Sequence, residues 1–238
     1  MTRNSFSASA KPVIEAVGFD LDGTLYPNYR LNCRLFPFLL RDMRLLLAFG
    51  KARDRIRAAQ ETGTGLPPGR DFYGYQAELT AEILHAPVQA VKEQIERLIY
   101  RGWEPHFKKI RLFPYVVETL RALREAGLKL GMLSDFPPEI KLKNLGIDGL
   151  WDTALGSEQT GALKPAVRPF MALAQALDTS PEKILYVGNS FRYDVAGAGR
   201  AGMYTALVTR RNPPDRPDSA LPGFTFYDYR QLRDFVLQ

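Results

Sequence analysis

Two aspartates separated by one residue are the clearest candidates for chemistry in this sequence. Asp20 and Asp22 follow a short apolar run, and Gly23 and Thr24 come directly after them. A carboxylate such as Asp20 can attack the phosphorus atom of a phosphate ester and form an aspartyl phosphate. A second carboxylate can protonate the leaving oxygen and then deprotonate the attacking water, a role typically worth ~10²–10⁴-fold in rate. We therefore assign Asp20 as candidate nucleophile and Asp22 as candidate general acid/base.

Other polar residues follow apolar runs that lie far away in the chain. Ser134 ends one such run, Lys164 stands between Leu and Pro, and Asp194 follows another run. A phosphate dianion repels an attacking carboxylate, so this chemistry needs positive charge at the site. A divalent cation with oxygen ligands, typically Mg²⁺, supplies part of that charge. The Lys164 ammonium and the Ser134 hydroxyl can hold the phosphate oxygens.

Each of these residues also has an ordinary structural interpretation. The Asp20–Asp22 pair could shape a turn, and Ser134 could simply end a strand. Lys164 could lie at the surface, and Asp194 could cap the helix that it precedes. Four such features in the right order favour the catalytic interpretation.

Short apolar segments that alternate with helical segments must position these residues. The expected strands cover 13–19, 129–133, 153–155, 184–187 and 204–208, and the expected helices cover 116–126, 139–145, 169–177, 194–201 and 229–237. This alternation favours a parallel sheet that is covered on both faces. Ligands bind outside the carboxyl ends of the strands in such sheets. The candidate residues should therefore meet at one edge of the sheet.

The segment between the first strand and the second has a different character. From residue 31 to about residue 100, apolar residues recur at helical spacing, and Gly and Pro residues divide the segment into three or four helices. We therefore expect a discontinuous α/β core, residues 1–26 and 111–238, that carries an all-helical insertion at 27–110. The proline-rich segment 210–223 is expected to be an exposed loop.

Four motifs resemble those of the haloacid dehalogenase (HAD) superfamily of phosphohydrolases. They are the run Asp20-Leu-Asp-Gly-Thr-Leu, the strand that ends in Ser134, the Leu-Lys-Pro around Lys164, and the segment from Val187 to Asp194. The resemblance extends over nearly the whole chain. It implies a Rossmann-like core with a C1-type helical cap that opens and closes over the site. It also implies a phosphatase or phosphomutase, because members that act on carbon–halogen bonds lack the second aspartate.

The resemblance further implies a set of ligands. Mg²⁺ would be held by Asp20, Asp22, Asn189 and Asp194, and the substrate phosphate by Ser134, Asp135 and Lys164. Two positions depart from the family pattern. Asn189 stands where Asp is common, which removes a negative charge and should weaken metal binding. Asp135 stands where Asn is frequent, and a carboxylate beside a phosphate dianion is unfavourable unless it is turned away or bonded to a substrate hydroxyl. We hypothesise that the two changes compensate each other in charge.

The net charge of +6 comes from one segment. Residues 30–57 contain eight Lys or Arg and two Asp, and the rest of the chain balances to zero. On a helix, Arg41, Arg44, Lys51 and Arg55 would fall within a narrow arc, which is typical of a solvated helix face. The alternative is that these cap residues grip an anionic substrate. No basic platform interleaved with aromatic residues accompanies them, so nucleic-acid binding is not expected.

The composition is typical of a globular protein, with 45% apolar and 24% charged residues. The single Cys33 has no intrachain partner, which favours a reducing compartment. No apolar run reaches the ~18 residues of a membrane span, and residues 1–11 lack the apolar stretch of a secretory signal. We therefore expect a cytoplasmic protein that does not contact membranes.

These observations predict a Mg²⁺-dependent hydrolase of small-molecule phosphate monoesters, of the phosphoglycolate phosphatase type or similar. Sugar phosphates and nucleoside monophosphates stay open as substrates, because the cap decides the choice. A phosphomutase or 5'-nucleotidase of the same superfamily is an alternative, and a catalytically weak binding protein is an alternative of another class. The aromatic residues of the cap could line a leaving-group pocket, but such residues more often form the core of the cap; they are Phe72, Tyr73, Tyr75, Tyr100, Trp103 and Phe107.

Overall fold

A six-stranded parallel sheet forms the centre of the molecule. The computed structural model describes residues 13–29, 40, 42–67, 70–102, 107–108, 110–210 and 222–238. The strands are β1 (Ala16–Phe19), β2 (Lys129–Ser134), β3 (Thr153–Gly156), β4 (Ile184–Gly188), β5 (Tyr204–Val208) and β6 (Phe224–Phe226). Their order in the sheet is β3-β2-β1-β4-β5-β6, and every neighbouring pair is parallel. The predicted Rossmann-like α/β fold is therefore confirmed.

β1 lies in the middle of the sheet. The chain adds β2 and β3 on one side of it, and then β4, β5 and β6 on the other side. β1 pairs with β2 on one side and with β4 on the other. In open sheets of this kind, the crevice outside the carboxyl ends of the two strands where the chain changes sides is the usual ligand site. Asp20 follows β1 directly, so the topology alone puts the candidate nucleophile at that crevice.

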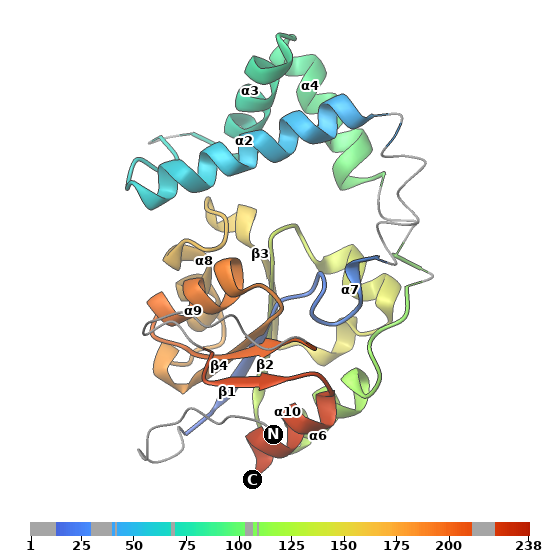
Figure 1. Cartoon of the computed structure of the whole chain (residues 1–238), viewed down its shortest axis with the longest axis vertical. Coiled ribbons are helices and arrows are strands. Elements are labelled where there is room, and N and C mark those ends of the chain that lie inside the picture. Colours follow the sequence, from blue (N-terminus) through green and yellow to red (C-terminus); the bar gives the residue numbers. More distant parts are fainter. Residues whose placement is uncertain are drawn as a thin grey trace.

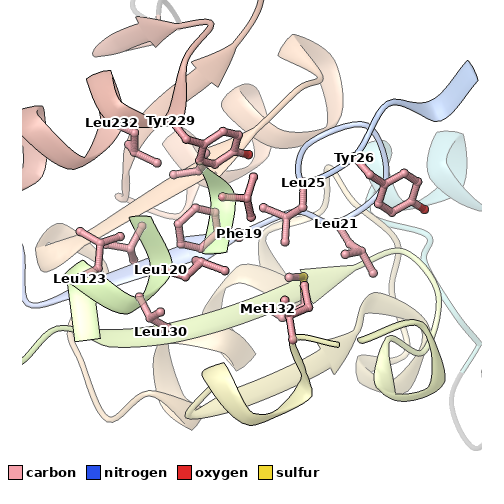
Figure 2. Close-up of a cluster of buried hydrophobic side chains, with 14 of the residues drawn as sticks. Phe19, Leu21, Leu25, Tyr26, Leu120, Leu123, Leu130, Met132, Tyr229 and Leu232 are labelled. Atoms are coloured by element: carbon pink, nitrogen blue, oxygen red, sulfur yellow. The ribbon is translucent and has the colours of Figure 1, made fainter. Parts of the chain in front are cut away.

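Helices cover both faces of the sheet (Figure 1). α6 (Val116–Glu125) and α10 (Tyr229–Leu237) pack on one face, and α8 (Val167–Ala176) and α9 (Ala196–Arg200) pack on the other. Strand residues alternate between the faces, because Val17 and Phe19 join the first cluster and Ala16 the second. Figure 2 shows Phe19 packed with Leu120 and Leu25 in the first cluster. Full burial of one such side chain stabilises the fold by ~1.5–3 kcal/mol.

The inserted segment between β1 and β2 forms a helical layer above the carboxyl edge of the sheet. It contains α2 (Met43–Glu61), α3 (Phe72–Leu84) and α4 (Val88–Ile95), which continues into the wider turn η1 (Glu96–Tyr100). Figure 1 shows α2 lying between the sheet domain and the pair α3–α4. These helices share a small core of their own, with Leu45, Phe49, Ala77, Ala81, Val91, Ile95 and Ile99 buried. The exact boundaries, 1–26 and 111–238 against 27–110, stay a prediction.

Several elements differ in detail from the sequence-based expectations. The short strand β6 was not expected, because only three residues pair and they follow the proline-rich segment. The expected helix at 194–201 is preceded by the π-type turn η5 (Phe191–Val195), so regular helix begins at Ala196. Helix α7 (Glu139–Leu145) has the expected bounds. Most of the expected loop at 210–223 lies outside the described residues. Within the described ranges, no helix has the length and apolar character needed to cross a membrane.

Candidate active site

Three residues from distant parts of the chain meet at the carboxyl edge of the sheet. The ammonium nitrogen Nζ of Lys164 lies 2.7 Å from Oδ1 of Asp20 and 2.8 Å from Oδ1 of Asp194. Asp20 follows β1, Asp194 lies in η5 after β4, and Lys164 stands in the loop before α8. All three side chains are buried. The sequence-based expectation that strand ends and the lysine loop converge is met by this geometry.

Two glycines permit this convergence. Gly23 has a φ of +89°, a backbone conformation that other residues rarely adopt, and a Cβ there would lie 2.3 Å from the Asn189 amide nitrogen. A Cβ on Gly188 would lie 2.3 Å from Cβ of Asp194. The loop after β1 therefore passes closely over the loop after β4. Thr24 links the two, because its hydroxyl donates to Asp20 Oδ2 at 2.6 Å and lies 3.4 Å from the Asn189 amide oxygen.

The second aspartate is held on both carboxylate oxygens. Lys141 Nζ lies 2.6 Å from Oδ2 of Asp22, and the Tyr26 hydroxyl donates to Oδ1. The Ser134 hydroxyl lies 3.4 Å from Oδ2. Lys141 is not among the residues predicted from the sequence, although its position in the chain offered a signal. Lys141 lies on the first turn of α7, the helix that follows the second motif, so it is close in sequence to Ser134.

The electrostatic environments of the two aspartates differ. Burial raises the pKa of Asp20 to about 7; the Lys164 ammonium opposes this shift, and the Asp194 carboxylate adds to it. Burial alone would also raise the pKa of Asp22, but the Lys141 ammonium holds it below its ordinary value. Asp20 and Asp194 together keep Lys164 charged, because they raise the pKa of its ammonium against the effect of burial. Asp20 therefore needs additional positive charge if it is to be fully ionised at neutral pH.

Asp135, expected among the phosphate-binding residues, faces two arginines of the helical layer. Arg57 Nη2 lies 2.7 Å from Asp135 Oδ2, and Arg53 Nη2 lies 3.4 Å from the same atom. Arg53 also pairs with Glu158 of the core, and Arg57 Nε donates to the backbone oxygen of Lys164 at 3.0 Å. We call Arg53, Arg57, Asp135 and Glu158 the cap–core ion cluster. The Asp135 carboxylate is thus turned toward the helices, where its charge is compensated.

The basic segment divides into two faces of α2. Arg44, Lys51 and Arg55 are exposed, as expected for a solvated helix face, whereas Arg41 lies outside the described residues. Arg53 and Arg57 were not singled out, yet both are buried. Arg57 follows Arg53 by four residues, and Arg53 follows the buried Phe49 by four. Residues four apart lie on the same face of a helix, so this spacing could have placed both arginines on the inner face of α2.

The donor set suits a hard divalent cation. The carboxylates of Asp20 and Asp194 approach the Lys164 ammonium from two sides, and the Asn189 amide oxygen lies beside the Thr24 hydroxyl, which donates to Asp20. Within the described ranges, no three His, Cys, Asp or Glu side chains converge as a metal site. Mg²⁺ is commonly bound through one or two carboxylates and keeps several waters. Two carboxylates with an amide oxygen therefore fit Mg²⁺ better than a metal that requires His or Cys.

Comparison with known proteins places the chain in a family. The family model described as haloacid dehalogenase-like hydrolase matches residues 14–202. The chain belongs to the haloacid dehalogenase-like hydrolases. The matched range contains every candidate site residue discussed above. The resemblance inferred from the four motifs is therefore confirmed.

Two curated relatives match this HAD hydrolase over most of its length, and both are phosphatases by name. A glyceraldehyde 3-phosphate phosphatase of Methanopyrus kandleri is 30% identical and covers 94% of this chain and 97% of its own. A phosphoglycolate phosphatase of Haemophilus influenzae is 29% identical and covers 91% and 95%, respectively. The expected enzyme class, a HAD-like phosphatase, is confirmed at this level.

A solved structure supports the fold independently. The HAD-hydrolase YfnB from Bacillus subtilis bound to magnesium superimposes with a TM-score of 0.63 and covers 94% of this chain and 99% of its own. Its sequence identity is 16%, so this likeness concerns the fold alone.

Proposed function

We propose that this HAD hydrolase cleaves small-molecule phosphate monoesters in the cytoplasm, with Mg²⁺ and through an aspartyl phosphate on Asp20. The observation that carries the proposal is the position of the Lys164 ammonium between the carboxylates of Asp20 and Asp194. A lysine in this place provides a fixed positive charge for the phosphate oxygens beside the nucleophile. Asp22 stands two residues away and supplies the acid/base that the reaction needs.

The reaction proceeds in two steps on this chain's residues. An Asp20 carboxylate oxygen forms a bond to phosphorus, the bond from phosphorus to the ester oxygen breaks, and Asp22 donates a proton to that oxygen. Asp22 then removes a proton from water, which attacks phosphorus and releases inorganic phosphate and free Asp20. The free Asp22 carboxyl has a lowered pKa. A phosphate dianion beside it raises that pKa, because like charges disfavour ionisation, so substrate binding favours the protonated acid.

Mg²⁺ would be held by Asp20, Asp194 and Asn189, with Asp22 completing the set expected from the sequence. The bound ion supplies positive charge that favours the ionised form of Asp20 and shields it from the phosphate dianion. Ser134 and Lys164 hold the phosphate oxygens.

The relatives support a small substrate. The two phosphatases named above act, by their names, on glyceraldehyde 3-phosphate and phosphoglycolate. Lys141, the partner of Asp22, lines a cavity of about 280 Å³, and this volume suits small esters better than a nucleic acid.

The test is a panel of phosphate monoesters assayed with and without Mg²⁺. We expect Mg²⁺-dependent phosphate release that Asp20→Asn reduces by on the order of 10⁴-fold or more, and acid-quenched labelling of Asp20 by radioactive phosphate. Asp148→Asn, on the exposed turn η2 (Asp148–Leu150), is the matched control and should keep full activity. Equal phosphate release by the wild type and Asp20→Asn would refute the proposal.

A further inference from the structure

A cavity of about 280 Å³ lies between the helical layer and the core. Its walls come from both parts of the molecule. The cap contributes Tyr73 and Tyr100, and Phe136 and Lys141 come from the segment after β2. In the described part of the chain, neither this cavity nor a larger depression beside α8 is lined by a residue predicted as a site residue, but Lys141 of the smaller cavity bonds to Asp22. The smaller cavity is therefore the one whose position bears on the chemistry.

The inner wall of this cavity adjoins the proposed acid/base. Lys141, which lines the cavity, bonds to Asp22 through Nζ. Phe107 also lines it, and its ring packs edge-on against Tyr26, which donates to the other oxygen of Asp22. The residue that protonates the leaving oxygen must face the leaving group. The cavity thus lies on the side where the organic part of the ester departs.

The walls are largely aromatic. Tyr100 packs edge-to-face against Tyr73 at 5.8 Å and against Phe136 at 6.1 Å between ring centroids. The Tyr100 hydroxyl is engaged, because it donates to Glu158 at 2.8 Å. Burial, with help from Glu158, raises the pKa of Tyr73 to about 12, so that this phenol stays neutral. Such a wall offers ring faces and edges to a ligand.

Charge at the cavity disfavours an anionic leaving group. Glu139 contributes a carboxylate to its lining. The other lining carboxylate, Glu96, is paired with Arg101, and the Lys141 ammonium is already paired with Asp22. A second carboxylate or phosphate on the substrate would meet the Glu139 carboxylate, and among the described residues that line the cavity the one ammonium, on Lys141, is already paired. A neutral group avoids this cost.

We propose that this cavity binds the leaving group and selects phosphate monoesters of neutral alcohols that carry an apolar, preferably aromatic, body. The proposal rests on the proposed function and narrows its substrate class. It separates this chain from relatives whose names give small polar or anionic substrates. The cap residues Tyr73, Tyr100 and Phe107 serve as the walls of the pocket, whereas Tyr75 packs in a different cluster, around Ile56, Phe72 and Leu163.

The test compares three esters: 2-phenylethyl phosphate, ethyl phosphate and 2-phosphoglycolate. The first two release aliphatic alcohols of similar basicity, so chemical reactivity does not separate them. We expect kcat/KM for 2-phenylethyl phosphate to exceed that for ethyl phosphate by at least about tenfold, in the range typical of apolar pocket contacts. We expect 2-phosphoglycolate to be cleaved no faster than ethyl phosphate.

Three variants locate the effect. Tyr73→Ala should remove most of the preference for the phenyl ester, whereas Tyr75→Ala on the same helix should keep both the preference and the kcat/KM for ethyl phosphate. Ile140→Asp changes an exposed residue of α7 that lines the cavity and should also reduce the preference without affecting folding. Equal kcat/KM values for the two alkyl esters, faster cleavage of 2-phosphoglycolate, or loss of preference in Tyr75→Ala alone would overturn this inference while leaving the hydrolase intact. Failure of the wild type to cleave any monoester would overturn the proposed function itself.

Discussion

Two clusters of buried charge lie side by side in this molecule, and they differ in balance. The active-site cluster holds three carboxylates against two ammonium groups: Asp20, Asp22, Asp194, Lys141 and Lys164. The cap–core ion cluster pairs two guanidinium groups with two carboxylates. The active-site cluster therefore keeps an excess of negative charge, which suits a cation. In the cap–core ion cluster, the positive and negative charges balance.

The same residue type responds differently in the two clusters. Asp20 shares one ammonium with Asp194, and burial raises its pKa to about 7. Burial would raise the pKa of Asp135 as well, but Arg53, Lys164 and Arg57 hold it below its ordinary value of 3.8. A buried aspartate thus becomes reactive or structural according to the cations that its neighbours supply. We expect the first cluster to govern catalysis and the second to govern how the helical layer is held.

The largest expected effect is on stability, at Arg53. Arg53→Met leaves Glu158 buried without its cation, and loss of one partner of a buried pair costs ~3–5 kcal/mol. The free energy of unfolding, measured in urea, should fall by about this amount. Arg55→Met, on the exposed side of the same helix, removes a solvated pair with Glu82 and should cost only ~0–1 kcal/mol. Equal losses in the two variants would mean that the cap–core ion cluster does not hold the layers together.

The next effect is on catalysis, at Lys164. Lys164→Met removes the charge between Asp20 and Asp194, and loss of one such electrostatic contact lowers kcat by ~10²–10³-fold. Because Lys164 opposes the effect of burial on Asp20, the pKa of Asp20 should rise further in this variant. Lys183→Met, which breaks an exposed pair with Glu15, is the matched control and should keep its kcat. A kcat for Lys164→Met within threefold of the wild type would count against this assignment, provided that unfolding in urea shows a folded protein.

The sequence predicted the sheet and the active-site cluster better than the cap–core ion cluster. Short strands that end in polar residues are local features, and the parallel topology brings their ends together whatever the loops do. Asp20, Lys164 and Asp194 could therefore be placed together from the sequence alone. Arg53 and Arg57 could not, because their partners Asp135 and Glu158 depend on how the helical layer docks on the core. Lys141 was missed for a similar reason, since the rotation of α7 is set by packing.

A smaller effect is expected at Asp135, and it depends on pH. Asp135→Asn leaves Arg53 with Glu158 and Arg57 with Asp54, so the loss should be only ~1–2 kcal/mol. The folded pKa of Asp135 lies below 3.8, the value expected when it is unfolded. Its contribution is therefore complete above that value and is lost as the pH falls through the folded pKa. The difference in unfolding free energy between wild type and variant should be constant from pH 7 to about pH 5 and shrink below about pH 4. A difference that grows on acidification would contradict this assignment.

The smallest expected effect concerns Asn189. A substitution there can add negative charge to the active-site cluster, which already carries an excess of it. The Asn189 oxygen lies beside Thr24, which donates to Asp20, so Asn189→Asp places another carboxylate next to the candidate metal ligands. If the excess negative charge holds Mg²⁺, the variant should bind the ion up to about tenfold more tightly, about 1.4 kcal/mol. Calorimetric titration with Mg²⁺ measures this without an activity assay, and Asn144→Asp on α7 adds the same charge outside the strand ends as a control. Unchanged affinity would mean that Asp135 and Asn189 do not compensate each other. It would also mean that carboxylate excess alone does not distinguish the two clusters. In that case the difference would lie in geometry, because Asp20 and Asp194 share the single ammonium of Lys164, whereas Asp135 faces two guanidinium groups.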